Sequence, residues 1–540
     1  MSANGYKSGA TTPNQAASMR PLFAGTLVSR LLGFVRDMLF AALLGPAADA
    51  FVTAFRLPNI FRRLLAEGSL GLPLAAESAR LAADARNCAH TKTDAFLRAK
   101  DFSTRVSLGA LTVSAFLCLL AAVFARPFLY ILAPGLEASV AQQAVLCLRL
   151  CLPYVPLCLF SALAFAQALA AGNALAQAYA PSAVNVCLIL AACLAFLVSP
   201  AAPKTASLLL CAGLLAGSLV QALIAARCLD LRVNTLFSLW RDALRGLARP
   251  TPERRFLQRL PEAMAGAAPH QLHILAALFL ASFAAPGCIS ALYFAERLVE
   301  LPLGLAGAAP ALAMLPGLSR SAAQKDWPGF SQSISATLSM GQFIALPAAA
   351  GLFALAAPIT GLLFGHGAFD ADMVALCAAA LSGYALGLPA LSAARSLITA
   401  LHTLKADKGA LRDALFSLGP LALAGAAAPC MPSNLWQGAA LGAGMGASAW
   451  LLAWLLLRRM RRNAPWLPNP FAAARSFFLR YALSALFLGA VLCCLSVSGL
   501  WACAAIALSL FAWFGGHLAW GSPDAAAFVA MLRKKRPPTP

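Results

Sequence analysis

Apolar stretches about twenty residues long recur along the whole chain, and they constrain its fold more than any other feature. The clearest stretch runs from Tyr481 to Pro523 and contains no Asp, Glu, Lys or Arg. A helix needs about 20 apolar residues to cross the roughly 30 Å hydrocarbon core of a bilayer. The chain is 61% hydrophobic and 11% charged, whereas soluble domains carry about 25% charged residues. The sequence therefore predicts an all-α, polytopic membrane protein.

The apolar pattern predicts about 14 transmembrane helices. A basic segment at 227–259 follows the sixth of them, which predicts two six-helix lobes plus two C-terminal helices, a division typical of transporters. The predicted spans lie at residues 22–44, 49–70, 103–125, 145–171, 181–199, 206–226, 270–285, 291–315, 335–357, 373–401, 411–430, 435–457, 476–497 and 500–520.

These spans set the expected domain boundaries. They are a cytosolic N-terminal tail at 1–21, an N-lobe at 22–228, a basic cytoplasmic loop at 229–269, a C-lobe at 270–457, a second basic loop at 458–475, a final helix pair at 476–522 and a basic cytoplasmic tail at 523–540.

The net charge of +21 reflects membrane orientation more than nucleic-acid binding. Of the 41 basic residues, 31 fall on one predicted side of the membrane, 8 lie inside spans, and only Arg126 and Lys204 fall on the other side. Lys and Arg accumulate in cytoplasmic loops. We therefore expect both termini in the cytoplasm, and no nucleic-acid partner.

Charged side chains inside the predicted spans are the strongest functional signal. The stretch "SRLLGFVRDMLFAALLG" at 29–45 carries Arg30, Arg36 and Asp37. A charge at mid-membrane costs roughly 2.5–3.5 kcal/mol on insertion scales and usually faces a bundle interior or a wet cavity. The spans hold more arginines than carboxylates, which are Asp37, Asp49, Glu67, Glu296 and Glu300; the arginines are Arg30, Arg36, Arg56, Arg62, Arg63, Arg149, Arg297 and Arg395.

Two explanations of these arginines remain open. They can form ion pairs between helices or reach to the membrane interface, or they can bind an anion such as phosphate, which suits the guanidinium fork. We favour anion binding for Arg30, Arg36 and Arg297. On the eighth span, Tyr293, Arg297 and Glu300 share one face, and Arg297 can pair with Glu300 at i,i+3. Pro302 and Pro310 can bend this helix.

Other motifs point away from catalysis. No Walker loop, HExxH, GxSxG or paired-carboxylate signature occurs. The histidines show no spacing typical of a metal site, so we expect no metal, no cofactor and no enzymatic activity. Gly438, Gly442 and Gly446 follow a small-xxx-small pattern that predicts close helix packing.

Two segments resemble a known family. "SRLLGFVRDMLFAALLGPAADAFVTAFRLPNIFRRLLAEGSL" at 29–70 and "YFAERLVELPLGLAGAAPALAMLPGLSRS" at 293–321 are similar to the MurJ/MviN family of bacterial lipid II flippases. That family belongs to the MOP exporter superfamily and has a MATE-like fold. The resemblance implies alternating-access transport of lipid II, the undecaprenyl-diphosphate-linked disaccharide-pentapeptide, from the inner to the outer leaflet.

The resemblance also implies roles for individual residues. Arg30, Arg36 and Arg297 would contact the diphosphate, and the last two helices would hold the lipid tail. The further charged positions that transport would need are Asp49, Arg62 and Glu300, and the cavity-lining positions would be Asn59, Ser290 and Tyr293. Some family members bind sodium through an acidic residue in the seventh span; Ala277 stands there in this chain, so we expect no conventional sodium site.

Several alternatives to lipid II transport remain open. The chain could export another polyprenyl-linked oligosaccharide or a small molecule within the same superfamily. It could be a membrane enzyme acting on a lipid diphosphate, although the residues that such chemistry needs are not evident, or a scaffold whose basic loops recruit the cell-wall synthesis machinery. We expect a monomer in the bacterial inner membrane, in contact with lipid II and membrane lipids.

Overall fold

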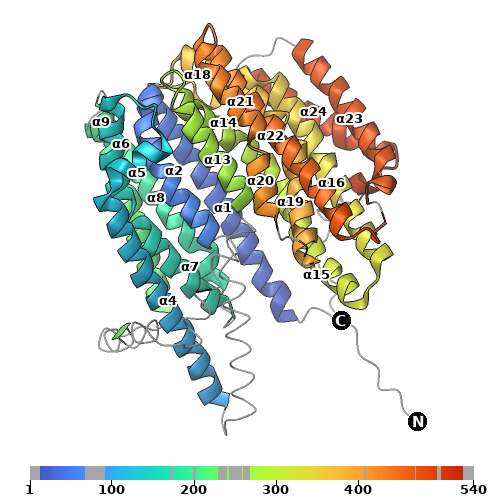
Figure 1. Ribbon diagram of the computed structural model, residues 1–540, viewed down its shortest axis with the longest axis horizontal. Coiled ribbons are helices and arrows are strands. Elements are labelled where there is room, and N and C mark those ends of the chain that lie inside the picture. Colours follow the sequence, from blue (N-terminus) through green and yellow to red (C-terminus); the bar gives the residue numbers. More distant parts are fainter. Residues whose placement is uncertain are drawn as a thin grey trace. The chain divides into compact units, whose positions relative to one another are not determined.

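The computed structural model describes residues 13–66, 92–170, 174–198, 202–228, 240–241, 258, 268–404, 406, 409–468, 470–494 and 500–526. Within these residues every regular element is helical, as predicted (Figure 1). Most of the predicted loop at 229–269, residues 1–12 of the predicted tail and residues 527–540 lie outside the described residues.

The helices of the first half run as follows: α1 (Pro13–Leu44), η1 (Gly45–Ala47), α2 (Ala48–Ala66), α4 (Lys92–Val123), α5 (Ala125–Leu132), α6 (Ala138–Cys151), α7 (Tyr154–Ala170), α8 (Ala174–Val198) and α9 (Pro203–Cys228). Helix α1 begins within the segment predicted as a tail, nine residues before the predicted span at 22.

The helices of the second half are α13 (Ala268–Ala281), α14 (Cys288–Leu303), the π-helical η2 (Gly304–Ala308), α15 (Ala309–Gln324), α16 (Trp327–Ala354), α17 (Ala356–Phe364), α18 (Ala371–Ala385), α19 (Leu388–Thr403), α20 (Ala410–Phe416), α21 (Gly419–Ala427), η3 (Ala428–Cys430), α22 (Asn434–Asn463), α23 (Pro470–Cys494) and α24 (Leu500–Ala519).

The structure contains fewer described helices that are long and apolar enough to span a membrane than the 14 spans predicted from the sequence. Among the described residues, 8 helices are long and apolar enough to cross a membrane, or 9 if the bent pair α18–α19 counts as one span. Leu27–Arg63 forms one helical stretch, α13 near the predicted span at 270–285 is short, and the span at 291–315 is interrupted. α23 and α24 are 25 and 20 residues long, which fits the predicted spans at 476–497 and 500–520 in length. The count of 14 therefore stays a prediction.

The interruption between α14 and α15 follows from proline chemistry. Pro310 has no N–H, so the carbonyl of Ala306, four residues earlier, lacks its usual helical donor. The hydroxyl of Ser392 on α19 donates to that carbonyl at 2.8 Å and satisfies it. A π-helical turn occupies Gly304–Ala308, close to the predicted bend at Pro302 and Pro310.

The chain divides into two compact units. Unit 1 comprises the described residues within 1–40, 54–126 and 143–267, and unit 2 those within 41–53, 127–142 and 268–540. The predicted lobes at 22–228 and 270–457 stay a prediction.

Unit 1 is built on close contacts among α4, α7, α8 and α9. Its core cluster contains Leu108, Phe160, Phe165 and Ala225. Glycines bring α9 against α8: a Cβ placed on Gly217 would lie 2.6 Å from the Cα of Val184. Small residues allow this approach where lipid supplies no hydrophobic drive between helices.

In unit 2, glycines of α22 likewise allow close helix packing. A Cβ on Gly442 would lie 2.1 Å from the carbonyl oxygen of Ala380 in α18, and one on Gly446 would lie 2.7 Å from that of Gly383. Gly438 packs as tightly, 2.6 Å from a methyl of Leu376. The prediction that this small-xxx-small run packs helices is confirmed.

The C-terminal helices dock on α16 through aromatic and polar contacts (Figure 1). The Tyr481 ring of α23 lies 5.3 Å from Phe343 of α16, and the indole N–H of Trp513 in α24 donates to the Phe343 carbonyl at 3.1 Å. The Tyr481 hydroxyl donates to Asp524 at 2.7 Å and also bonds the Ser522 hydroxyl. These buried polar bonds fix residues 522–524, beyond α24, to α23.

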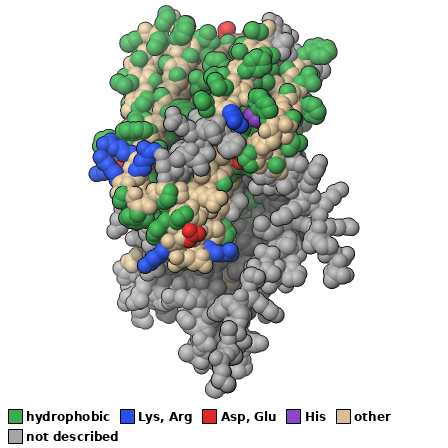
Figure 2. Space-filling model, turned by 90° about the vertical axis from the view of Figure 1, so that its right-hand side faces the viewer, with side chains coloured by type: hydrophobic (Ala, Val, Ile, Leu, Met, Phe, Trp, Pro, Cys, Tyr) green, Lys and Arg blue, Asp and Glu red, His purple; other side chains and the backbone are tan. Residues whose placement is uncertain are grey.

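The outer surface is rich in apolar side chains. In the view of Figure 2, hydrophobic side chains cover the upper part, and the largest group of Lys and Arg side chains lies at the left edge, below it. Large exposed apolar residues include Phe487, 73% exposed, and Phe511, 79% exposed. Such a surface suits contact with lipid acyl chains.

Candidate functional site

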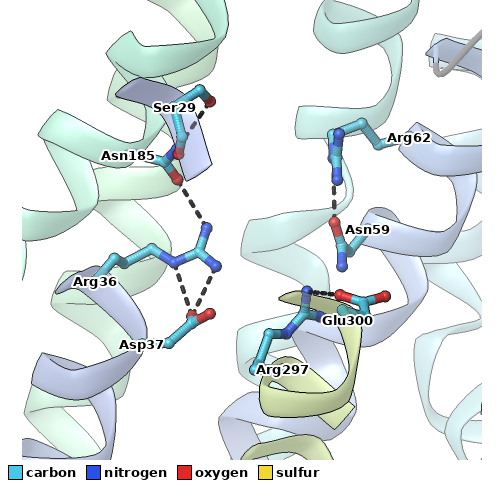
Figure 3. A network of polar contacts seen from close by, with 8 residues as sticks. All are labelled: Ser29, Arg36, Asp37, Asn59, Arg62, Asn185, Arg297 and Glu300. Carbon is cyan, nitrogen blue, oxygen red and sulfur yellow. Dashed lines mark hydrogen bonds and ion pairs between the residues drawn. The ribbon is translucent and has the colours of Figure 1, made fainter. Parts of the chain in front are cut away.

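In unit 1, Arg36 is the centre of a polar network between α1 and α8 (Figure 3). Its Nε and Nη2 donate to Asp37 Oδ1 at 3.0 and 2.7 Å, and its Nη1 donates to Asn185 Oδ1 at 2.9 Å. The Asn185 amide donates in turn to the Ser29 carbonyl at 2.9 Å. The Arg36 and Asp37 side chains are 12% and 4% exposed. Asp37 therefore balances the Arg36 charge, and Asn185 orients the guanidinium.

The spacing of small residues on α1 explains why α8 comes so close. Gly25, Ser29 and Gly33 recur every four residues and share one helical face. A Cβ on Gly25 would lie 2.3 Å from the carbonyl oxygen of Ala178, and Gly33 faces the Asn185 amide. Arg36 continues this face by one turn, so the glycines bring its guanidinium within reach of α8.

The other predicted residues of unit 1 lie outside this network. Arg30 is six residues before Arg36, about 120° away around the helix. It is exposed and forms no hydrogen bond or ion pair with any described residue. On α2, the Arg62 Nε donates to the Asn59 Oδ1 at 3.1 Å, and Asn59 is buried.

In unit 2, Asp49 holds the first turn of α14. The helix begins after Gly287, whose φ of +89° suits glycine and which has no side chain to cap the helix. The Asp49 carboxylate accepts the N–H of Gly287 at 2.7 Å, the N–H of Ser290 at 2.8 Å and the hydroxyl of Ser290. A capping box satisfies these same two N–H groups. Asp49 thus supplies, from α2, the cap that the α14 sequence lacks.

Further along α14, Arg297 contacts two predicted site residues, Tyr293 and Glu300, of which Figure 3 shows Glu300. Its Nη1 donates to Glu300 Oε2 at 2.9 Å, and its guanidinium carbon lies 4.7 Å from the centre of the Tyr293 ring. The predicted i,i+3 pair of Arg297 and Glu300 is confirmed. Tyr293 is 1% exposed, and its ring makes a cation–π contact with the guanidinium.

The arrangement within each unit is an arginine paired with a carboxylate from its own helix. Among the described residues, no group of His, Cys, Asp and Glu could hold a metal ion. The structure also adds one residue that the sequence reasoning missed: Asn185, an amide within the apolar run "AVNVCLIL", where a polar side chain signals a buried partner.

Comparisons with known proteins agree with this architecture. A family model described as "Lipid II flippase MurJ" matches residues 39–522. A probable lipid II flippase MurJ of Rhizobium meliloti is 33% identical over 377 residues, which cover 68% of this chain and 66% of that protein. The match thus spans about two thirds of this relative's length.

Solved structures show the same fold. A lipid II flippase MurJ in an inward closed conformation matches with a TM-score of 0.66 and 19% identity, covering 95% of this chain and 99% of that one. An inward-facing MATE multidrug resistance transporter of the MOP superfamily matches with a TM-score of 0.60 and 16% identity, covering 81% of this chain and 95% of that one. The family model and the curated relative together show that the chain belongs to the MurJ family.

Proposed function

We propose that this chain, a multi-pass bacterial membrane protein, is a lipid II flippase that moves the peptidoglycan precursor from the inner to the outer leaflet by alternating access. The observation that carries the proposal is the family match over residues 39–522. Relatives are named as flippases, which are transporters, so we assign the chain transport and no bond-making chemistry.

We propose further that Arg30, Arg36 and Arg297 bind the diphosphate of the cargo. A guanidinium has five N–H groups, and Arg36 uses three of them on Asp37 and Asn185. The two others form no hydrogen bond with a described residue, so they can donate to a phosphate oxygen. Arg30, exposed and without a bonded partner among the described residues, can do the same.

The paired carboxylates give the arginines a way to release the cargo. Asp37 and Glu300 compete with the diphosphate for Arg36 and Arg297, because each already bonds its arginine at 2.7 to 2.9 Å. A hydrogen bond to a charged group contributes about 1.5–3 kcal/mol. The carboxylate therefore weakens the binding free energy of the cargo by a comparable amount. When the cargo leaves, the carboxylate re-forms its hydrogen bond with the arginine. Asp49, Arg62, Asn59, Ser290 and Tyr293 would support this site by holding α2 and α14 in place.

A leaflet-accessibility assay for lipid II tests the site in liposomes that contain the full-length chain. Arg36→Gln and Arg297→Gln should each slow transport about tenfold to a hundredfold, the loss of one charged hydrogen bond. Arg149→Gln is the matched control, because Arg149 lies exposed in a span and donates to the Ala122 carbonyl at 3.1 Å. Transport at the control rate by both site variants, each folded, would remove the arginines from the mechanism.

Membrane orientation and the lipid tail complete the proposal. Both termini lie in the cytoplasm, which the 31-to-2 distribution of basic residues supports. Helices α23 and α24 hold the polyprenyl tail, and their exposed apolar side chains at Leu486, Phe487 and Phe511 support this role. The chain works as a monomer, and its basic loops contact the cell-wall synthesis machinery. Labelling of cysteines placed near residue 7 and near residue 535, from each side of the membrane, tests the orientation.

A further inference from the structure

A basic pocket of about 330 Å³ lies between α20 and α22, within unit 2, and its lining contains none of the arginines proposed to bind the diphosphate. Its lining includes Arg412 from α20 and Arg458, Arg459 and Arg462 from α22. Asp413 is the acidic side chain in that lining. Four arginines and one aspartate give the pocket a formal charge of +3.

The aspartate is fully engaged with one arginine. Arg459 donates to both carboxylate oxygens of Asp413, with Nη2 at 2.7 Å from Oδ1, and also to the Gly409 carbonyl at 2.9 Å. The two side chains are 11% and 9% exposed. This bidentate pair lines the pocket and carries no net charge. The charge of the pocket therefore belongs to the other three arginines.

Those three arginines are available to a ligand. Arg412, Arg458 and Arg462 are exposed, and none forms a hydrogen bond or ion pair with any residue that the structure describes. Arg458 lies over the Trp454 ring at 5.3 Å, a contact that orients its guanidinium while leaving its N–H groups open. Three arginine side chains around one cavity can donate their paired guanidinium N–H groups to phosphate oxygens.

The positions of the lining residues within two candidate membrane spans place the pocket at a membrane surface. Ala410–Cys430 and Asn434–Asn463 are both candidate spans, and the arginines occupy the first turn of one and the last turns of the other. Apolar lining residues lie one turn further into each span: Phe416, four residues after Arg412, and Leu455, three residues before Arg458. One turn is about 5.4 Å, so the lining changes from cationic to apolar toward the bilayer.

We propose that this pocket binds the headgroup phosphate of an anionic phospholipid of the surrounding leaflet. The three arginines hold the phosphate, and Phe416 and Leu455 contact the start of the acyl chains. Basic pockets between transmembrane helices on the cytoplasmic side bind anionic headgroups in this way. A free phosphate would satisfy the arginines alone, whereas a lipid also uses the apolar half. The proposal does not depend on the cargo of the transporter.

Native mass spectrometry of the purified full-length chain, titrated with phosphatidylglycerol, tests the proposal. The triple variant Arg412→Gln, Arg458→Gln, Arg462→Gln should lose the tightest bound phosphatidylglycerol. At about fivefold in affinity per arginine near the surface, the three should together weaken binding about a hundredfold. The matched control is Arg461→Gln, which removes an exposed arginine of the same basic run that does not line the pocket.

Two further arms identify the ligand. Phosphatidylcholine should lose much less affinity than phosphatidylglycerol in the triple variant, because its choline cation offsets the charge of its phosphate; equal losses for the two lipids would overturn the preference for an anionic headgroup. Inorganic phosphate at millimolar concentration should not displace bound phosphatidylglycerol, because it lacks acyl chains; full displacement would overturn the lipid assignment. Equal losses of bound phosphatidylglycerol in Arg461→Gln and the triple variant would overturn the assignment of this pocket as the binding site. Equal melting temperatures in phosphatidylcholine show that the triple variant is folded.

Discussion

Replacing Asp49 should destabilise the chain more than replacing any exposed aspartate, because one carboxylate organises the start of α14. Asp49 accepts from two backbone N–H groups and one hydroxyl of the first turn, and it is 7% exposed. In Asp49→Ala, the N–H groups of Gly287 and Ser290 lose their acceptor. Gly287 cannot substitute, because it has no side chain and its φ is +89°.

The magnitude follows from counting the donors left without partners. Each buried donor without an acceptor costs about 1–3 kcal/mol, so two N–H groups cost about 2–6 kcal/mol. The Ser290 hydroxyl can rotate toward another acceptor and is left out of this sum. Asp49→Asn keeps one acceptor oxygen but turns an NH2 group toward a donor, which gives an intermediate loss of about 1–3 kcal/mol.

Thermal unfolding of the purified variants in detergent measures this order. Asp370 and Asp372 provide matched controls on α18, since both are exposed; Asp370 caps its helix through a 2.9 Å bond to the Met373 N–H. Asp370→Ala should cost about 1 kcal/mol, and Asp372→Ala a few tenths. The melting temperatures should rise in the order Asp49→Ala, Asp49→Asn, Asp370→Ala, Asp372→Ala. An Asp49→Ala chain that melts together with Asp372→Ala would refute the capping argument.

Three further outcomes are expected. Asp37→Asn should raise the affinity for undecaprenyl diphosphate about tenfold and slow its release, measured by equilibrium and off-rate binding, since Arg36 loses its competing charge; unchanged binding would contradict the exchange of carboxylate for cargo. Gly442→Ala should cost about 1–3 kcal/mol in thermal unfolding through overpacking, whereas Gly515→Ala, with open space around its Cβ, should be neutral. Tyr481→Phe should lose about 1 kcal/mol and increase proteolysis near residue 524; a wild-type digestion pattern would show that the hydroxyl does not hold this segment.

The sequence predicted local contacts well and long-range contacts poorly. Helical spacing alone placed Arg297 beside Glu300 and the glycines of α22 on one packed face, because both follow from 3.6 residues per turn. The cap from Asp49 to Ser290 joins residues 241 positions apart, and no local pattern encodes it. The resemblance named both residues as important, yet it gave no reason for their pairing.

The helix count shows a second limit of sequence patterns. A hydropathy profile reports the length of an apolar segment, but it does not show whether the helix formed by that segment is continuous or interrupted. The stretch at 291–315 reads as one span, but it contains a π-helical turn, and Ser392 of α19 satisfies the Ala306 carbonyl that Pro310 leaves without a donor. That hydrogen bond comes from a residue 86 positions later, so the proline was the only local sign of the interruption. Asn185 was missed for the same reason: its value depends on Arg36 in another helix.

The position of the carboxylates suggests why intramembrane arginines suit a transporter. Arg36 and Arg297 each pair within their own helix, one and three residues away. Such a helix enters the bilayer with its counterion attached, which reduces the cost of a bare charge. An ion pair between two helices would instead oppose any motion that separates them, because breaking it strands a buried charge. A same-helix pair moves as one body, and in the mechanism that we propose it would open for an anion and close again wherever the helix has moved. Such pairing would therefore favour repeated binding and release over permanent attachment.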